Sequence, residues 1–136
     1  MKNQTILRVA SLAFVGLSAL SILAVSLMAF VRPQSVMDLV GVTLPNTDAV
    51  SSIRGIYGGA GLTIVIMLVY LSQKNIREAL GFLVLLWGFY AISRAITQIN
   101  EGPLGAFGSQ WIVIESLFCG IALILLLGYQ RKLSLI

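Results

Sequence analysis

The stretch that decides the fold reads SSIRGIYGGAGLTI, from Ser51 to Ile64. It opens a long apolar run, yet it contains one arginine, Arg54, and four glycines. An arginine at the start of an apolar helix is costly unless it has a partner or a use, and glycines let a second backbone approach closely. The stretch therefore predicts a tightly packed membrane helix with a charged group near one end.

The chain contains four long apolar runs. They lie at 9–31, 56–71, 79–99 and 111–129. Each is close to the roughly 20 residues that a helix needs to cross about 30 Å of hydrocarbon. Backbone groups in lipid must be hydrogen-bonded within the protein, and the short alternating segments of a transmembrane barrel are absent from the sequence. We therefore expect the four runs to be helices.

The composition also indicates a membrane protein. Hydrophobic residues make up 58% of the 136 residues and charged residues 10%, against about 25% charged in a typical soluble domain. The mean hydropathy is +0.97. A small soluble protein leaves much of its surface exposed and could not hide so much apolar surface. We predict an all-α integral membrane protein, in which residues 1–136 form a single transmembrane domain with the architecture of a four-helix bundle.

The expected helices are bounded by turn formers and charges. They span about 6–31, 51–72, 77–99 and 110–130, with a short interfacial helix at about 33–40. Pro33 can start the short helix and Gly41 can end it. The apolar core of a secretory signal peptide is only about 7–15 residues long, shorter than the first run. We therefore expect the first run to be an uncleaved helix.

Basic residues are unevenly distributed over the connections. Six of them lie at the N-terminus, in the second connection and at the C-terminus: Lys2, Arg8, Lys74, Arg77, Arg131 and Lys132. The first and third connections carry Arg32 together with Asp38, Asp48 and Glu101. Since cytoplasmic loops carry an excess of Lys and Arg, both termini and the 73–78 turn are expected in the cytoplasm. The net charge of +4 thus reflects the orientation of the chain in the membrane. It predicts anionic lipids, and not nucleic acid, as partners.

Three ionisable residues lie inside the expected spans: Arg54, Arg94 and Glu115. A charge near the bilayer centre costs about 2.5–3.5 kcal/mol on insertion scales, so each predicts a partner or a use. All three lie a few residues inside the outer end of their expected helices, which at 1.5 Å per residue places them roughly 5–8 Å below the outer surface. We predict that they form a cluster in which Glu115 lies between the two arginines.

Residues near the predicted cluster lie on matching helix faces. Tyr90, Arg94 and Gln98 form one stripe of the third span, and Tyr57 follows Arg54 by about one turn of the second. Helix-packing glycines are expected at Gly55, Gly58, Gly59 and Gly61. The Gly55-x-x-x-Gly59 spacing lets helices approach closely. The glycines would bring another backbone near Arg54 or leave room for a ligand beside it.

The predicted cluster has three interpretations. Arg and Glu pairs can simply staple helices together, and long side chains near an interface can reach water. Alternatively, two arginines and one glutamate leave a surplus positive charge that suits an anionic headgroup, a carboxylate or a polar quinone-like head. A proton or ion relay is the third interpretation.

The residue types present exclude several kinds of chemistry. The chain has no histidine, which is the commonest metal ligand and the usual general base. Its one cysteine, Cys119, cannot form an intrachain disulfide and lies in an apolar run, where cysteine acts as a small hydrophobe. We therefore expect no bound metal, no cofactor and no catalytic residue.

Three segments resemble a family of short bacterial four-helix membrane proteins of unknown function, similar in architecture to the DoxX-like proteins. They are IRGIYGGAG at 53–61, SRAITQINEGP at 93–103 and IVIESLFCG at 112–120. The specific parts are the Arg-Gly-x-Tyr-Gly-Gly run, Arg94 and Glu115. The resemblance covers nearly the whole chain and implies a four-helix bundle in the inner (cytoplasmic) membrane of a bacterium. In the family pattern an acidic residue often stands where this chain has Ser51, which makes Glu115 the expected counterion of Arg54.

These observations favour a non-enzymatic role. We expect a multi-pass inner-membrane protein that acts as an accessory subunit or binds a lipid-like or small anionic ligand at the predicted cluster. An oligomeric transporter of small solutes or ions is one alternative, because the Gly-rich start of the second span could be a helix break near a substrate. A subunit of a quinone-linked redox complex is another, which would take its cofactor from a partner. A homo-oligomer or another membrane protein is the expected protein partner.

Overall fold

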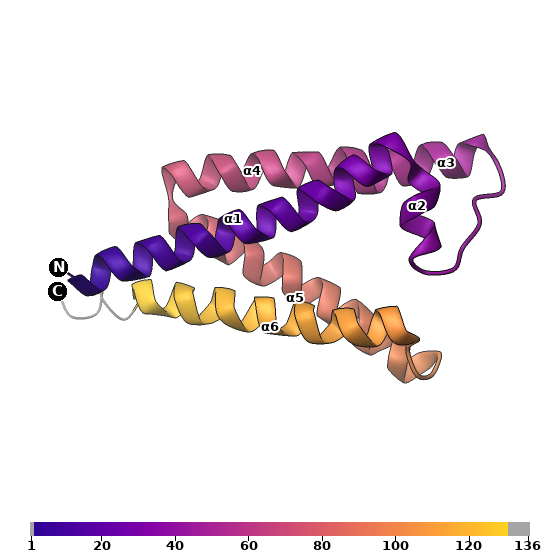
Figure 1. Ribbon diagram of the computed structural model, residues 1–136. Coiled ribbons are helices and arrows are strands. Elements are labelled where there is room, and N and C mark those ends of the chain that lie inside the picture. Colours follow the sequence, from indigo (N-terminus) through magenta and orange to yellow (C-terminus); the bar gives the residue numbers. More distant parts are fainter. Residues whose placement is uncertain (1, 131–136) are drawn as a thin grey trace. The chain divides into compact units, whose positions relative to one another are not determined.

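The computed structural model describes residues 2–130, which are helical over most of their length and contain no strand (Figure 1). The elements are α1 (Lys2–Val31), α2 (Pro33–Asp38), α3 (Thr47–Ile53), η1 (Arg54–Ala60), α4 (Gly61–Lys74), α5 (Ile76–Asn100) and α6 (Ala106–Gln130). All are α-helices except η1, which is a π-helix. The predicted all-α fold class is confirmed for this part of the chain.

Four helical segments are long and apolar enough to cross a membrane. They are Gln4–Val31, Thr47–Lys74, Ile76–Asn100 and Ala106–Tyr129. The protein is therefore a multi-pass membrane protein, as its sequence predicts. The cytoplasmic position of the termini and the choice of the bacterial inner membrane stay predictions, and Arg131 and Lys132, which contribute to the first, lie outside the described residues.

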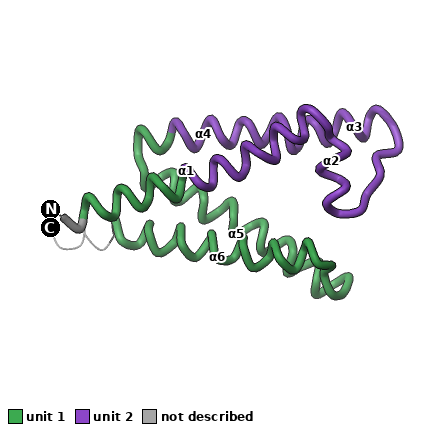
Figure 2. The backbone as a smooth tube through the Cα atoms, viewed as in Figure 1, with its two compact units in different colours: residues 1–15, 71–136 green, residues 16–70 purple. Residues whose placement is uncertain are grey.

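The chain divides into two compact units (Figure 2). Unit 1 comprises Met1–Val15 and Leu71–Ile136, and unit 2 comprises Gly16–Tyr70. Unit 1 therefore contains the beginning of α1 with α5 and α6, whereas unit 2 contains the rest of α1 with α2, α3, η1 and most of α4. Each unit is described by itself, and a single domain over the whole chain stays a prediction.

The end of α1 in unit 2 explains the position of Arg54. Pro33 has no backbone N–H, so α1 ends at Val31 and the last carbonyls of the helix lose their usual donors. The Nε of Arg54 donates to the carbonyl oxygen of Phe30 at 3.0 Å. A cation at the C-terminus of a helix also interacts favourably with the helix dipole. Arg54 therefore caps α1 from a different helix.

Two glycines allow α1 to pack closely against the second span. A Cβ atom at Gly58 would lie 2.7 Å from Cδ2 of Phe30, and one at Gly61 would collide with Oγ of Ser26. Ser26 is buried, and its hydroxyl donates to the carbonyl oxygen of Ile22 at 2.8 Å. Gly58 and Gly61 are thus the positions of closest approach within unit 2.

The other two predicted packing glycines lie in open space. A Cβ atom at Gly55 or Gly59 would meet nothing within 4 Å in the described structure. Both belong to η1, whose wider turns connect α3 to α4 without interrupting the span. Because π-helices are rare and occur often at functional sites, η1 is an unusual element for this motif to form.

The second span begins earlier than the apolar run alone predicts. The side chain of Asn46 accepts a hydrogen bond from the backbone N–H of Ala49 at 2.8 Å and caps the N-terminus of α3. Asp48 in the first turn adds a negative charge where the helix dipole favours one. The helix therefore starts at Thr47, although its first two residues, Thr47 and Asp48, are polar.

The short helix α2 begins with Pro33, as the sequence predicts, and packs on protein. Val36 and Met37 are buried against Ala29, whereas Leu39 and Val40 are exposed. Val25, Leu44, Ile53 and Tyr57 surround this core. The chain then turns at Gly41, whose φ of +69° favours glycine.

Gln34 organises the connection that follows α2. Its Nε2 donates to Oδ1 of Asp38 at 2.7 Å and to the carbonyl oxygen of Val42 at 2.9 Å. Its Oε1 accepts from the backbone N–H of Leu44 at 2.9 Å. One side chain therefore holds both sides of the turn at Gly41 together.

In unit 1, α5 and α6 pack side by side in opposite directions (Figure 1). The ring of Trp87 meets the ring of Phe118 at 5.1 Å, and Phe118 meets Phe14 of α1 at 5.4 Å, both edge to face. The Sγ of Cys119 donates to the carbonyl oxygen of Val84 at 3.5 Å. These contacts form the centre of unit 1, and Cys119 serves there as a small packing residue.

Substitution of Gly61 tests the close approach in unit 2. We expect Gly61→Ala to lower the free energy of unfolding in detergent by about 1–3 kcal/mol, because the new methyl group must displace Ser26. Ser26→Ala in the same chain removes the hydroxyl in conflict and is expected to restore part of the loss. Gly59→Ala is the matched control, since a Cβ atom there meets open space. An equal effect of Gly59→Ala and Gly61→Ala would contradict this packing.

Candidate functional site

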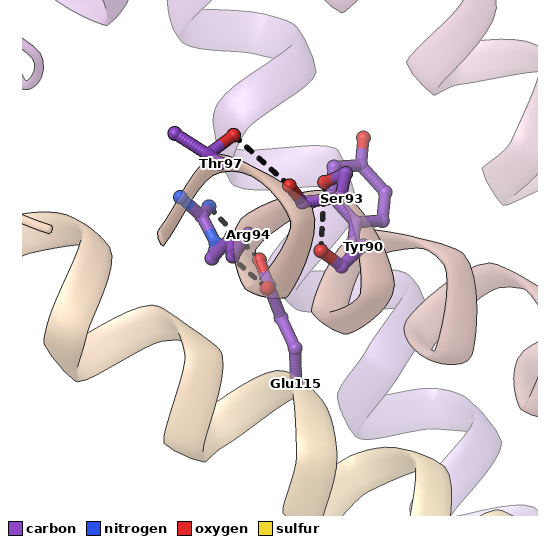
Figure 3. Close-up of polar contacts among 5 residues, drawn as sticks. All are labelled: Tyr90, Ser93, Arg94, Thr97 and Glu115. Atoms are coloured by element: carbon purple, nitrogen blue, oxygen red, sulfur yellow. Dashed lines mark hydrogen bonds and ion pairs between the residues drawn. The ribbon is translucent and has the colours of Figure 1, made fainter. Parts of the chain in front are cut away.

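Arg94 and Glu115 form a bidentate ion pair between α5 and α6 (Figure 3). The Nε of Arg94 donates to Oε2 of Glu115 at 2.7 Å, and its Nη2 donates to Oε1 at 2.9 Å. The Glu115 side chain is 2% exposed and that of Arg94 is 22% exposed. The carboxylate is therefore enclosed, while the guanidinium keeps an accessible edge.

This pair satisfies a carboxylate that would otherwise be very costly in an apolar environment. An isolated buried charge is strongly disfavoured, but a fork of two parallel N–H···O bonds offsets much of that cost. The pair is electrically neutral as a whole. Among the described residues, the Nη1 group of Arg94 has no hydrogen-bond acceptor. The pair can therefore present N–H donors to a further oxygen atom.

Phe107 adds an aromatic wall to the pair. The guanidinium carbon of Arg94 lies 5.7 Å from the centre of the Phe107 ring, within the range of a cation–π contact. The ring of Trp111 lies 5.9 Å from that of Phe107. Phe107 is not among the predicted site residues, because the predicted fourth helix begins near residue 110 whereas α6 begins at Ala106. The spacing of four between Phe107, Trp111 and Glu115 is the signal that could have found it.

Two other predicted site residues lie in the same part of α5. The carbonyl oxygen of Tyr90 accepts from Oγ of Ser93 at 2.8 Å, and the carbonyl oxygen of Ser93 accepts from Oγ1 of Thr97 at 3.0 Å (Figure 3). The Tyr90 ring lies 6.2 Å from that of Trp87. Gln98 is exposed. The hydroxyls of Ser93 and Thr97 are thus directed to the backbone of their own helix.

The remaining predicted site residues belong to unit 2. Arg54 caps α1, Tyr57 packs on the core around Met37, and Gly58 and Gly61 contact α1. The structure thus pairs Arg94 with Glu115 within unit 1. That Arg54 shares a cluster with this pair stays a prediction.

An apolar groove runs along one face of α5. It has a volume of about 400 Å³ and is lined by Phe82, Leu85, Leu86, Phe89, Tyr90 and Ser93. These positions recur at helical spacing and end one residue before Arg94. The groove therefore places apolar surface beside the end of α5 that carries the ion pair.

Removing one partner of the pair tests how much it stabilises the protein. We expect Arg94→Ala to lower the free energy of unfolding in detergent by about 3–5 kcal/mol, because it leaves a buried carboxylate without a counterion. Replacing both residues by methionine is expected to cost far less, since no buried charge remains. Lys74→Met is the control for the loss of an exposed cation. If Arg94→Ala were as mild as the double substitution, the pair would be a surface contact.

Comparison with known proteins gives one family. Residues 10–126 match a domain of unknown function, DUF4345. No curated protein and no solved structure matches the chain. The matched region includes α2, α3, η1, α4 and α5 completely and most of α1 and α6, and with them Arg54, Arg94 and Glu115. The chain therefore belongs to the DUF4345 family, as a small multi-pass membrane protein.

Proposed function

We propose that this protein is a non-enzymatic membrane protein that binds a lipid-like or small anionic ligand, with Arg94 as the residue that holds the polar head. The proposal rests on the hydrogen bonding and exposure of Arg94. One edge of its guanidinium is bonded to the enclosed carboxylate of Glu115, while the side chain stays 22% exposed with donors left over.

An arginine held in this way is suited to binding. A free arginine loses side-chain entropy when it binds a ligand, whereas Glu115 has already fixed the orientation of Arg94. The planar guanidinium can then donate to the oxygens of a phosphate, a carboxylate or a carbonyl group. The neighbouring ring of Phe107 adds apolar contact beside the donors.

The groove on α5 supports an amphiphilic ligand. Five of its six lining residues are large and apolar or aromatic, and Ser93 lies at the end nearest Arg94. An acyl or isoprenoid tail in this groove would bring a polar head to the end of α5 that carries the pair. The pair has no surplus charge of its own, so a singly charged or neutral polar head matches it better than a multivalent anion.

A role as an accessory subunit is compatible with this binding site and with the absence of any soluble domain in the described residues. The proposed likeness to DoxX-like proteins concerns architecture alone and carries no argument about the ligand. Any contribution of Arg54 to the same ligand is part of the proposal and rests on the predicted depth of the three charges.

Exchanging the two charges separates a binding site from a helix staple. The variant with Arg94→Glu and Glu115→Arg keeps the ion pair but places the guanidinium on α6 and the carboxylate on α5. We expect it to unfold thermally like the unmodified protein and to lose about tenfold in ligand affinity, which corresponds to 1.4 kcal/mol.

The readout is native mass spectrometry of protein released gently from its own membrane. The mass retained by the unmodified chain identifies the ligand class. Arg32→Ala, which removes an exposed arginine outside this pair, is expected to retain the same mass. Retention of the ligand by the exchanged variant, or a bare chain in every sample, would show that the pair only staples α5 to α6.

A further inference from the structure

Two polar side-chain atoms at the other end of α5 and α6 are buried without a hydrogen-bond partner. They are Nε of Arg77, in the first turn of α5, and the hydroxyl oxygen of Tyr129, in the last turn of α6. Buried polar atoms without a partner are few in folded proteins, and each calls for an explanation such as a missing ligand. Both atoms can donate, so a group rich in acceptor oxygens would satisfy both.

The register of the two helices brings these residues to the same end of unit 1. Arg94 pairs with Glu115, Trp87 meets Phe118, and Val84 accepts from Cys119. In all three pairs the residue that lies earlier in α5 contacts a residue that lies later in α6, as in any antiparallel pair of helices. This order places the first turn of α5 at the same end of unit 1 as the last turn of α6, where Tyr129 lies.

The beginning of α1 joins the same end. A Cβ atom at Gly128 would lie 3.2 Å from Cδ1 of Leu7, so α1 and α6 are in contact one residue away from Tyr129. The neighbouring residue of α1 is Arg8, which is exposed. The first turn of α5, the last turn of α6 and the beginning of α1 therefore lie at the same end of unit 1 as the two atoms that have no partner.

Positive charge dominates this end. Arg8, Lys74 and Arg77 belong to it, and none of them has an acidic partner within salt-bridge distance in the described structure. The one acidic residue nearby, Glu78, accepts a hydrogen bond from Nδ2 of Asn75. Arg131 and Lys132 follow Tyr129 closely in the sequence. An anion is thus favoured here over any neutral acceptor.

The depth of the site indicates which anion. The third membrane span begins at Ile76 and the fourth ends at Tyr129, so both residues lie where the hydrocarbon gives way to headgroups. The negatively charged group with several acceptor oxygens at this depth is the phosphate of a phospholipid. Arginine binds phosphate through two parallel N–H groups, and basic pockets between membrane helices recognise anionic headgroups.

We propose that Arg77 and Tyr129 form a binding site for the phosphate group of an anionic phospholipid. One phosphate oxygen accepts from Nε of Arg77 and another from the hydroxyl of Tyr129, while Arg8 and Lys74 supply the surrounding positive charge. Both binding side chains are half-buried but their donor atoms are buried, so binding of the phosphate requires these side chains to rotate. The site is independent of the Arg94–Glu115 pair, which lies at the other end of the two helices.

Two conservative substitutions test the site. Tyr129→Phe removes only the hydroxyl group, and Arg77→Gln removes the charge and the fork of donors while keeping most of the length. The protein is delipidated in a neutral detergent and titrated with phosphatidylglycerol, with thermal unfolding as the readout. We expect each variant to bind this lipid about tenfold more weakly than the unmodified chain, which is the loss of roughly one good hydrogen bond to a charged group.

Three controls define the outcome. Tyr70→Phe, which alters an exposed tyrosine of α4, is expected to bind phosphatidylglycerol normally. Phosphatidylcholine, whose headgroup has no net charge, is expected to stabilise all variants equally and weakly. The variant with Arg94 and Glu115 exchanged is expected to keep its affinity for phosphatidylglycerol, which separates this site from the proposed function.

Competition with inorganic phosphate distinguishes the source of the phosphate group. If millimolar inorganic phosphate leaves lipid binding unchanged, the occupant of the site is a lipid. If inorganic phosphate displaces the lipid from the unmodified chain but not from Tyr129→Phe, the site also binds free phosphate, and the assignment to lipid is wrong. Equal affinity of phosphatidylglycerol for the unmodified chain, Arg77→Gln and Tyr129→Phe would overturn the proposal, because the lipid would then gather through net charge alone.

Discussion

The requirement that every backbone carbonyl in an apolar environment find a donor shapes unit 2. Pro33 stops α1, so the carbonyl of Phe30 loses the N–H that a continuing helix would supply and accepts a hydrogen bond from Arg54. This bond ties the end of α1 to the start of η1. The close contacts of Gly58 with Phe30 and of Gly61 with Ser26 follow along the same two helices. One arginine therefore caps a helix and joins two membrane spans.

Arg94 neutralises a buried charge, whereas Arg54 satisfies a backbone carbonyl. Its partner is a carboxylate on a neighbouring helix, enclosed almost completely, and the two groups cancel each other's charge. Arg54 and Arg94 thus have separate local partners, one a backbone oxygen and one a side chain. A guanidinium tolerates both because its five donors spread over a rigid plane, so satisfying some of them leaves others available.

Features that depend on the length of apolar runs and on side-chain charge could be predicted from the sequence. Four spans follow from four apolar runs, and the pairing of Arg94 with Glu115 follows from the common depth of two opposite charges. The partner of Arg54 could not be predicted in this way, because a backbone carbonyl has no sequence signature. The π-helix at Arg54–Ala60 was also missed, since a hydrogen bond to the fifth residue leaves the same glycine-rich, apolar pattern as an α-helix. Phe107 was not predicted as a site residue, because the polar and glycine residues around it obscure the position in the sequence at which α6 begins.

The ion pair between α5 and α6 has a consequence for how the chain enters its membrane. A single helix that carried Arg94 or Glu115 alone into the bilayer would meet a barrier of about 2.5–3.5 kcal/mol for its charge. The connection between the two helices is short, from Glu101 to Gly105, so the charges can neutralise each other before either reaches the lipid. We therefore expect the last two spans to integrate together during biosynthesis, as a helical hairpin, after the ribosome has released both.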